Sequence, residues 1–172
     1  SAKMTNPVKS GKRLAGAEFC APMHALHGHV NWLVDKCDYI FLPSSLENRS
    51  ASDPFYENYC YYTQFSPPVV SLINSSIKSK TLTPLLYFDR GEQYVLKALY
   101  KSLVALDKEQ ISLKTIRSAY YMATRVAEEE RLAFKNLFSN SFKPGTDLSV
   151  VLLGRPYLTL AGSLNKGIPD IF

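Results

Sequence analysis

Residues 20–43, CAPMHALHGHVNWLVDKCDYIFLP, give the clearest indication of the fold. Pro22 suits the first turn of a helix, where a backbone donor would stay unpaired in any case. Apolar side chains then recur at helical spacing on one face, at Leu26, Val30, Leu33 and Val34. Residues 39–42 are a short apolar run closed by Pro43. The stretch therefore predicts a helix followed by a strand, with Cys20 directly before the helix.

The same alternation continues along the chain. Residues 82–88 read as a second strand, in which Pro84 favours an edge or a bulge, and residues 148–153 read as a third, continuously apolar strand. Helices are expected with Ser66 as a cap, after Gly91, and from Ser112, the last with a buried stripe from Ile116 to Leu137. This order predicts an α/β fold in which the three strands are neighbours in a small parallel, three-layer, Rossmann-like sheet.

Length and charge narrow the class of protein. The 172 residues suffice for one α/β domain, here residues 15–172, preceded by an N-terminal extension at 1–14. The abrupt beginning and end suggest a fragment of a larger protein. The first residues lack the apolar core of a signal peptide, no apolar run could span a bilayer, and the formal charge of +5 is spread along the chain. We therefore expect a cytoplasmic chain with neither membrane nor nucleic acid as a partner.

Three cysteines, Cys20, Cys37 and Cys60, are the main candidates for chemistry. Without a secretion signal they do not favour disulfides, and metal or redox chemistry gains weight. Because a helix start stabilises negative charge, Cys20 could serve as a nucleophile, a redox partner or a metal ligand. Cys37, at the far end of the same helix, is better explained as a buried thiol acting as a small apolar residue. We also expect Cys20 and Cys60 to lie closer to each other than to Cys37.

The histidines admit two interpretations. His24 and His27 would share a helix face and could form a zinc site with Cys20. The simpler alternative, which we favour, is that His27 and His29 pack against nearby backbone and hydrogen-bond there, since no acidic side chain is close in sequence. Gly28 is expected to permit close packing of the helix on the sheet.

Four motifs in order carry a family resemblance: Cys20-x-Pro-x-x-x-x-His27-Gly-His29, Asp38-Tyr-Ile-Phe-Leu-Pro43, Cys60-x-x-x-Gln64-x-x-Pro67, and Gly154-Arg-Pro-Tyr157 with Asn165-x-x-Ile168-Pro169. Over about residues 15–170 the chain resembles the uncharacterised region associated with 2-hydroxyacyl-CoA dehydratase activators, also called the CoA-substrate-specific enzyme activase family. That region is distantly similar to the dehydratase subunits, which hold an iron–sulfur cluster in a Rossmann-like fold. The chain departs from the pattern at His24, Tyr61 and Ala161-Gly162, where lysine, proline and Asp-Pro would be expected.

The resemblance implies a cofactor and partners. It makes Cys20 and Cys60 candidate ligands of a 4Fe-4S cluster in the full protein. Since four thiolates commonly hold such a cluster, the remaining ligands would come from outside the chain. No cluster is therefore expected in the isolated fragment. The partner would be a 2-hydroxyacyl-CoA dehydratase or the ATPase activator domain. The chain itself lacks glycine-rich phosphate loops, so ATP hydrolysis is not expected of it.

Two functions remain open at this stage, and no catalytic residue is assigned. The first is a cluster-carrying module of a dehydratase activation system. The second is a non-catalytic α/β interaction domain that docks activator to dehydratase without a cofactor. A zinc hydrolase is the least favoured, because no acid or base lies near the histidines. Arg155, expected at the carboxyl end of the third strand, is a candidate contact for an anion, although a structural salt bridge explains it equally well.

Overall fold

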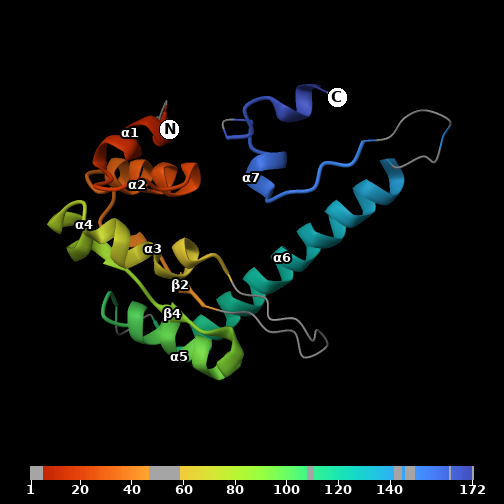
Figure 1. Cartoon of the computed structure of the whole chain (residues 1–172). Coiled ribbons are helices and arrows are strands. Elements are labelled where there is room, and N and C mark those ends of the chain that lie inside the picture. The colour runs from red at the N-terminus through yellow and green to blue at the C-terminus, as the bar shows by residue number, and fades with distance from the viewer. Residues whose placement is uncertain are drawn as a thin grey trace. The chain divides into compact units, whose positions relative to one another are not determined.

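A computed structural model describes residues 6–46, 59–107, 111–141, 145, 150–162 and 164–171 (Figure 1). The chain divides into two compact units, residues 1–121 and 122–172. Among the described residues, no helix is both long and apolar enough to cross a membrane.

The first unit begins with two packed helices, α1 (Pro7–Leu14) and α2 (Ala21–Leu33), seen in red and orange in Figure 1. The side-chain oxygen of Asn6 caps α1 by accepting a hydrogen bond from the backbone of the first turn at 3.0 Å. Part of the stretch expected as an N-terminal extension is therefore a helix that packs on α2.

Two glycines permit this close packing. A Cβ atom at Gly11 would overlap the carbonyl oxygen of His24, and one at Gly28 would overlap the carbonyl oxygen of Pro7. The sequence correctly predicts that Gly28 allows a close approach, but the neighbouring element is helix α1 and not the sheet.

Four short strands follow in two parallel pairs: β1 (Ile40–Phe41) with β3 (Thr81–Leu82), and β2 (Ser44–Ser45) with β4 (Leu85–Leu86). Ile40 lies opposite Thr81 and Ser45 lies opposite Leu86, so the register is the same in both pairs. The two pairs therefore lie in one parallel ribbon, in which the strand pairing is interrupted between β1–β3 and β2–β4.

Pro84 explains the interruption. The N–H groups of Leu42 and Ser44 donate to the carbonyl oxygens of Leu82 and Pro84 at 2.9 and 3.0 Å. In a regular parallel ladder, the hydrogen bond that falls between these two joins the N–H of residue 84 to the carbonyl oxygen of Leu42. Proline has no N–H, so this bond is missing. The sequence-based expectation that Pro84 disturbs its strand is confirmed.

The sheet differs from the prediction in its extent. The first two predicted strands do pair in parallel, so the α/β class is supported. The three-layer Rossmann-like sheet is not formed among the described residues, which make only two-stranded pairs. Of the third predicted strand, residues 148 and 149 lie outside the described part, and residues 150–153 are irregular and exposed. A continuous apolar run signals a preference for burial, but it does not specify a strand partner.

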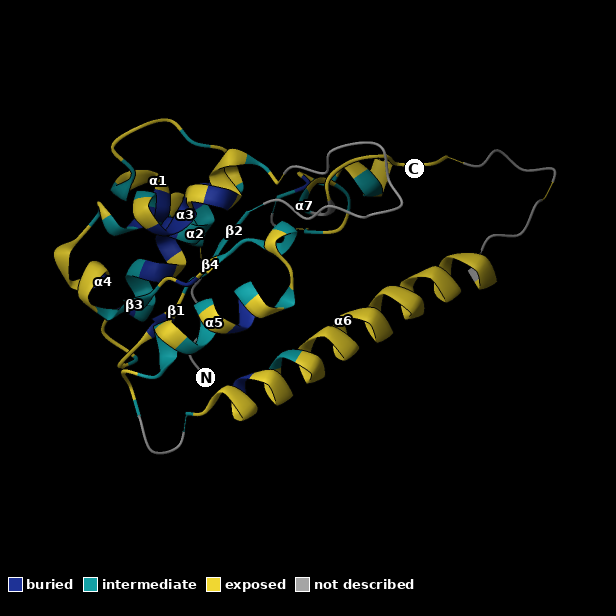
Figure 2. Ribbon diagram, turned by 90° about the horizontal axis from the view of Figure 1, so that it is seen from below, coloured by how far each residue is buried: buried dark blue, intermediate teal, exposed yellow. Residues whose placement is uncertain are grey.

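The core of the first unit joins α2 and β1 to α3 (Tyr61–Ser71) and α4 (Ser75–Lys80). Its buried side chains, dark blue in Figure 2, include Val30, Val34, Ile40, Val70 and Ile77. The ammonium group of Lys80 donates to the carbonyl oxygens of Val34 and Cys37 at 2.6 and 3.2 Å. This cation caps the C-terminal end of α2, where the helix dipole favours positive charge.

Helix α3 begins earlier than the sequence predicts. The expected cap, Ser66, lies inside the helix, as do Pro67 and Pro68. A proline at this depth leaves the carbonyl four residues earlier without its usual donor. Here the hydroxyl of Ser66 donates to that carbonyl, the oxygen of Thr63, at 3.3 Å. The prediction of a helix starting at Ser66 is therefore wrong, because a side chain supplies the missing donor.

Beyond the ribbon, a short 3-10 turn η1 (Phe88–Arg90) leads through Gly91 into α5 (Glu92–Leu103), which buries Val95 and Leu96. Helix α6 (Leu113–Ser141) starts in the first unit, where Tyr121 donates its hydroxyl proton to Glu92 at 2.8 Å. The stripe predicted to be buried along α6 is wrong beyond its start, since Ile116 is buried whereas Val126, Phe134 and Leu137 are exposed (Figure 2).

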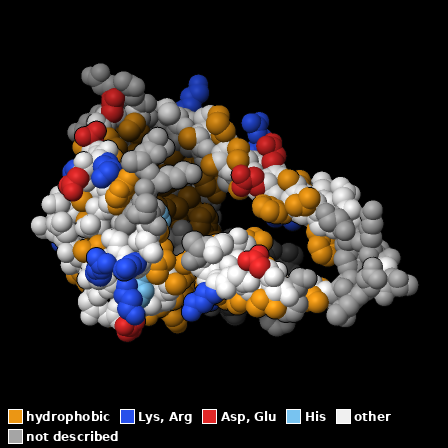
Figure 3. All heavy atoms as spheres, turned by 90° about the horizontal axis from the view of Figure 1, so that it is seen from above, with side chains coloured by type: hydrophobic (Ala, Val, Ile, Leu, Met, Phe, Trp, Pro, Cys, Tyr) orange, Lys and Arg blue, Asp and Glu red, His pale blue; other side chains and the backbone are white. Residues whose placement is uncertain are grey.

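The second unit holds the remainder of α6, helix α7 (Pro156–Thr159) and the 3-10 turn η2 (Ile168–Ile171). The Arg131 guanidinium hydrogen-bonds Glu128 and holds the pKa of that carboxyl below its ordinary value. On the face drawn in Figure 3, lysine and arginine side chains lie in separate groups interspersed with acidic ones.

Candidate functional site

Cys20 and Cys60 each stand at the start of a helix. Cys20 is the N-cap residue of α2, Cys60 is the N-cap residue of α3, and both have extended backbone angles. Neither side chain caps its helix, and the first-turn N–H groups of His24 and Gln64 donate to the cysteine carbonyl oxygens instead, both at 3.1 Å. Cys20 is exposed, Cys60 is half-buried, and neither is in a disulfide. Both sulfurs thus lie at the positive end of a helix.

An aromatic contact joins the two helix starts. Phe19, directly before Cys20, meets the ring of Tyr62, two residues after Cys60, edge to face with centroids 5.4 Å apart. Phe19 also stacks on His27, with centroids 5.2 Å apart. The structure therefore brings Phe19, at the start of α2, into contact with Tyr62, in the first turn of α3, whereas the proximity of Cys20 and Cys60 themselves stays a prediction. Phe19 was not singled out from the sequence, although its place next to Cys20 is a usable signal.

The two buried histidines form hydrogen bonds with backbone groups. His27, 1% exposed, donates from Nδ1 to the carbonyl oxygen of Met23 at 2.7 Å. His24, 4% exposed, accepts at Nε2 from the N–H of Phe19 at 3.4 Å, whereas His29 is exposed. The predicted backbone role is confirmed for His27 and not for His29. Across the described ranges, no three His, Cys, Asp or Glu side chains are grouped so as to hold a metal ion.

Cys37 has a structural environment of its own. It packs against the core of Val30, Val34 and Ile77, and its Sγ donates to the carbonyl oxygen of Leu33 at 3.2 Å. It follows the C-terminal end of α2, about 20 Å of helix from Cys20. These contacts agree with the interpretation of Cys37 as a small apolar core residue.

A cavity of about 340 Å³ lies between residues 14–19, His27 of α2 and the C-terminal end of α3. Phe19 and His27 line it, and the remaining lining residues are apolar or small: Leu14, Ala15, Gly16, Ala17, Val69, Leu72 and Ile73.

Arg155 belongs to the second unit and has a different setting from the one predicted. The strand expected before it is an irregular, exposed segment, so Arg155 does not stand at the carboxyl end of a buried strand. Its carbonyl oxygen accepts from the N–H of Leu158 at 2.8 Å, as expected of a residue that begins α7. Asn165, another motif residue, is 7% exposed and accepts from the N–H of Gly167 at 3.0 Å, which is a structural role.

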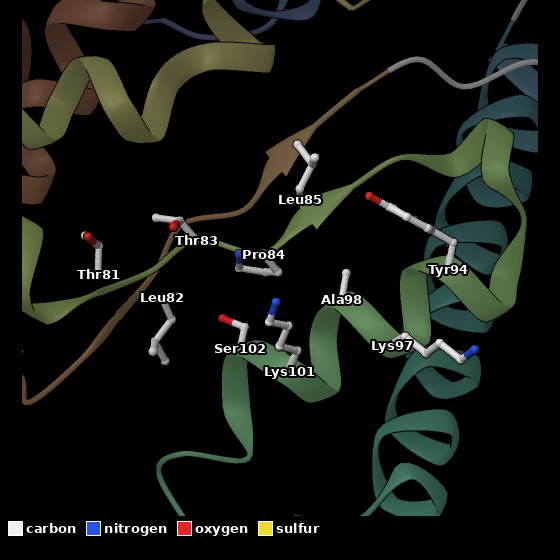
Figure 4. A pocket seen from close by; sticks show the side chains of 10 residues that line it. All are labelled: Thr81, Leu82, Thr83, Pro84, Leu85, Tyr94, Lys97, Ala98, Lys101 and Ser102. Carbon is white, nitrogen blue, oxygen red and sulfur yellow. The ribbon is translucent and has the colours of Figure 1, made fainter.

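A second, larger cavity was missed by sequence reasoning. Its volume is about 670 Å³, and it lies between strand residues 81–85 and one face of α5 (Figure 4). Two lysines, Lys97 and Lys101, and the hydroxyls of Thr81, Thr83 and Ser102 are among its lining groups. Only the spacing of Tyr94, Lys97, Ala98 and Lys101 on one helix face could have indicated it.

Residues 2–172 match the family described as the CoA enzyme activase uncharacterised domain, and the chain belongs to this family. The resemblance inferred from the four motifs is thereby confirmed. The family gives the chain an activator-related role and implies an enzyme partner. No curated protein and no solved structure matches the chain.

Proposed function

We propose that this chain is a module of a 2-hydroxyacyl-CoA dehydratase activation system and supplies two thiolates, from Cys20 and Cys60, to an iron–sulfur cluster in the full protein. The partner in this proposal is the dehydratase or the ATPase activator domain. The proposal is supported by membership of the CoA enzyme activase family and by the position of the two cysteines.

The contact between Phe19 and Tyr62 carries the proposal. It joins Phe19, next to Cys20, to Tyr62, two residues after Cys60, with ring centroids 5.4 Å apart, and this supports the proposal that both thiols reach one cluster. Anionic thiolates are stabilised at helix starts, and they are the usual ligands of iron–sulfur clusters. A bound cluster would supply one-electron chemistry there.

The nearby donors decide how much of a cluster this chain can hold. The Nδ1 of His27 donates to the carbonyl oxygen of Met23, and the Nε2 of His24 accepts from the N–H of Phe19. The Sγ of Cys37 donates to the carbonyl oxygen of Leu33, at the other end of α2. In this proposal Cys20 and Cys60 are two of the usual four ligands. The other ligands would come from protein outside this chain.

The test is anaerobic reconstitution of the full protein with ferrous iron and sulfide, followed by iron and sulfide analysis and visible absorption. The variants Cys20→Ser and Cys60→Ser should each lose most of the bound iron and the iron–sulfur absorption. Cys37→Ser is the matched control and should keep both, because its thiol lies in the apolar core. Far-ultraviolet circular dichroism should show that all three variants are folded.

The alternative, a docking domain without cofactor, gives a different result. It predicts colourless full protein with no iron after reconstitution, and equal behaviour of all three variants. If Cys37→Ser loses as much iron as Cys20→Ser, the assignment of the two helix-start cysteines is wrong.

A further inference from the structure

The cavity between residues 81–85 and α5, which we call the edge groove, has an open strand edge as one wall. The carbonyl groups of Leu82, Pro84 and Leu86 face the strand 40–46 and accept its N–H groups. Alternate residues of a strand direct their backbone groups to opposite edges, so the N–H and C=O of Thr83 and Leu85 face the groove. Within the described part of the chain, these four groups have no ladder partner.

The other wall of the edge groove is positively charged. Lys97 and Lys101 are exposed, four residues apart on α5, with the small side chain of Ala98 between them. Neither lysine has an ion pair among the described residues, and no acidic side chain occurs among the described lining residues. Figure 4 shows α5 running back along the strand, with the side chain of Lys101 extending toward Pro84 and that of Lys97 extending along α5 away from it.

The size and chemistry of the groove distinguish between possible occupants. A volume of about 670 Å³ lies in the usual range of ligand sites. A small anion would satisfy the lysines and the N–H groups of Thr83 and Leu85, but it would also face their carbonyl oxygens, which it cannot pair. A peptide strand both donates and accepts, so it satisfies the whole edge.

The two lysines match the repeat of such a strand. Residues four apart on a helix are separated by about 6 Å along its axis. Side chains two apart on a strand point to the same face and are separated by about 6.6 Å. Carboxylates at alternate positions of an added strand would therefore have nearly the same spacing as Lys97 and Lys101 have along α5.

We propose that the edge groove binds an extended segment of another protein, which adds to the edge of residues 81–85 as a third strand and carries carboxylates at alternate positions facing Lys97 and Lys101. The inference concerns a surface separate from the cysteines and is independent of the cluster proposal. It implies that variants at Cys20 and Cys60 bind the segment normally.

The probe is the peptide acetyl-Ser-Val-Glu-Val-Glu-Val-Ser-amide, titrated into ¹⁵N-labelled chain and followed by amide NMR. Binding should shift the amide signals of Thr83 and Leu85 and slow their hydrogen exchange. The amides of Leu82 and Leu86, which face the other strand, should keep their exchange rates. A peptide of the same charge that is N-methylated at the central valine and at both glutamates should not bind, because whichever alternate set of N–H groups faces the edge is then blocked.

Charge variants complete the test. The double variant Lys97→Gln and Lys101→Gln should weaken binding about fivefold, as expected for two exposed ion pairs. The matched control, Lys12→Gln and Lys36→Gln, removes the same charge elsewhere and should leave affinity unchanged. If inorganic phosphate or the N-methylated peptide binds as tightly, or if no peptide alters Thr83 and Leu85, the proposal is overturned, in the first case in favour of an anion site.

Discussion

Phe19 is the side chain that organises the candidate site at the scale of single residues. It stacks on His27 of α2 and meets Tyr62 of α3 edge to face, so it links the two helices close to the sequence positions of both cysteines. Aromatic pairs of this kind contribute beyond the area that they bury, because the edge of one ring is attracted to the face of another.

A double-mutant cycle tests the link between the helices. The variants Phe19→Ala and Tyr62→Ala, alone and combined, should give a coupling free energy of about 0.5–1.5 kcal/mol in denaturant unfolding. The control cycle pairs Phe19→Ala with Tyr61→Ala, since Tyr61 is 78% exposed, and its coupling should be near zero. Equal coupling in both cycles would contradict the contact.

The glycine contacts between α1 and α2 make a second prediction at this scale. Gly28→Ala should lower the free energy of unfolding by about 1–3 kcal/mol, because the new Cβ overlaps the carbonyl oxygen of Pro7 and the helices must separate. Helix propensity alone would favour alanine by about 1 kcal/mol, so a net loss shows that the steric overlap dominates.

Gly16→Ala is the matched control for this substitution. Gly16 has open space around a Cβ and no left-handed backbone angle, so its replacement should leave the unfolding midpoint nearly unchanged. A Gly28→Ala variant as stable as the original chain would show that α1 does not approach α2 this closely.

At the scale of elements, the two prolines of the parallel ribbon, Pro43 and Pro84, differ in their effect on the hydrogen bonds between its strands. Pro84 stands where an N–H would face the carbonyl oxygen of Leu42, whereas the backbone of Pro43 faces the opposite edge. Pro84→Ala should therefore create a new ladder bond, and Pro43→Ala should not. The gain from one hydrogen bond, about 1 kcal/mol, is offset by the greater freedom of the unfolded chain, so stability should change little.

Amide hydrogen exchange measures this difference directly. The new amide at position 84 should be protected to a degree similar to that of Leu86, and the new amide at position 43 should exchange fast. Rapid exchange at both positions would show that the ribbon is not continuous through residues 42–44.

The elements also show what sequence reasoning could reach. The strand pairing was predictable, because short apolar runs separated by helices favour parallel neighbours, and the effect of Pro84 follows from its missing N–H. The start of α3 was not predictable from proline rules, since the hydroxyl of Ser66 replaces the lost donor to Thr63. The edge groove was missed because its walls come from a strand edge and a helix face that meet only in the folded chain.

For the whole chain, the positions of the core and of the candidate ligands are separate. The core consists of apolar side chains from α2, β1, α3 and α4, among them Val30, Val70 and Ile77. Burial of each such side chain stabilises the fold by about 1.5–3 kcal/mol. The candidate ligands stand at helix starts, and Cys20 is exposed. We therefore expect the first unit to fold without a metal ion, unlike small zinc domains.

This separation predicts the behaviour of the isolated chain when metal is removed. Chain purified in air should contain far less than one iron–sulfur cluster, because two thiolates fall short of the usual four and an incompletely ligated cluster is lost to oxygen. Excess EDTA should leave its thermal unfolding midpoint unchanged relative to EDTA already saturated with calcium, since the core is apolar. Iron near one cluster per chain would mean that this chain holds the missing ligands itself, and a lower midpoint in EDTA alone would mean that a metal ion supports the fold.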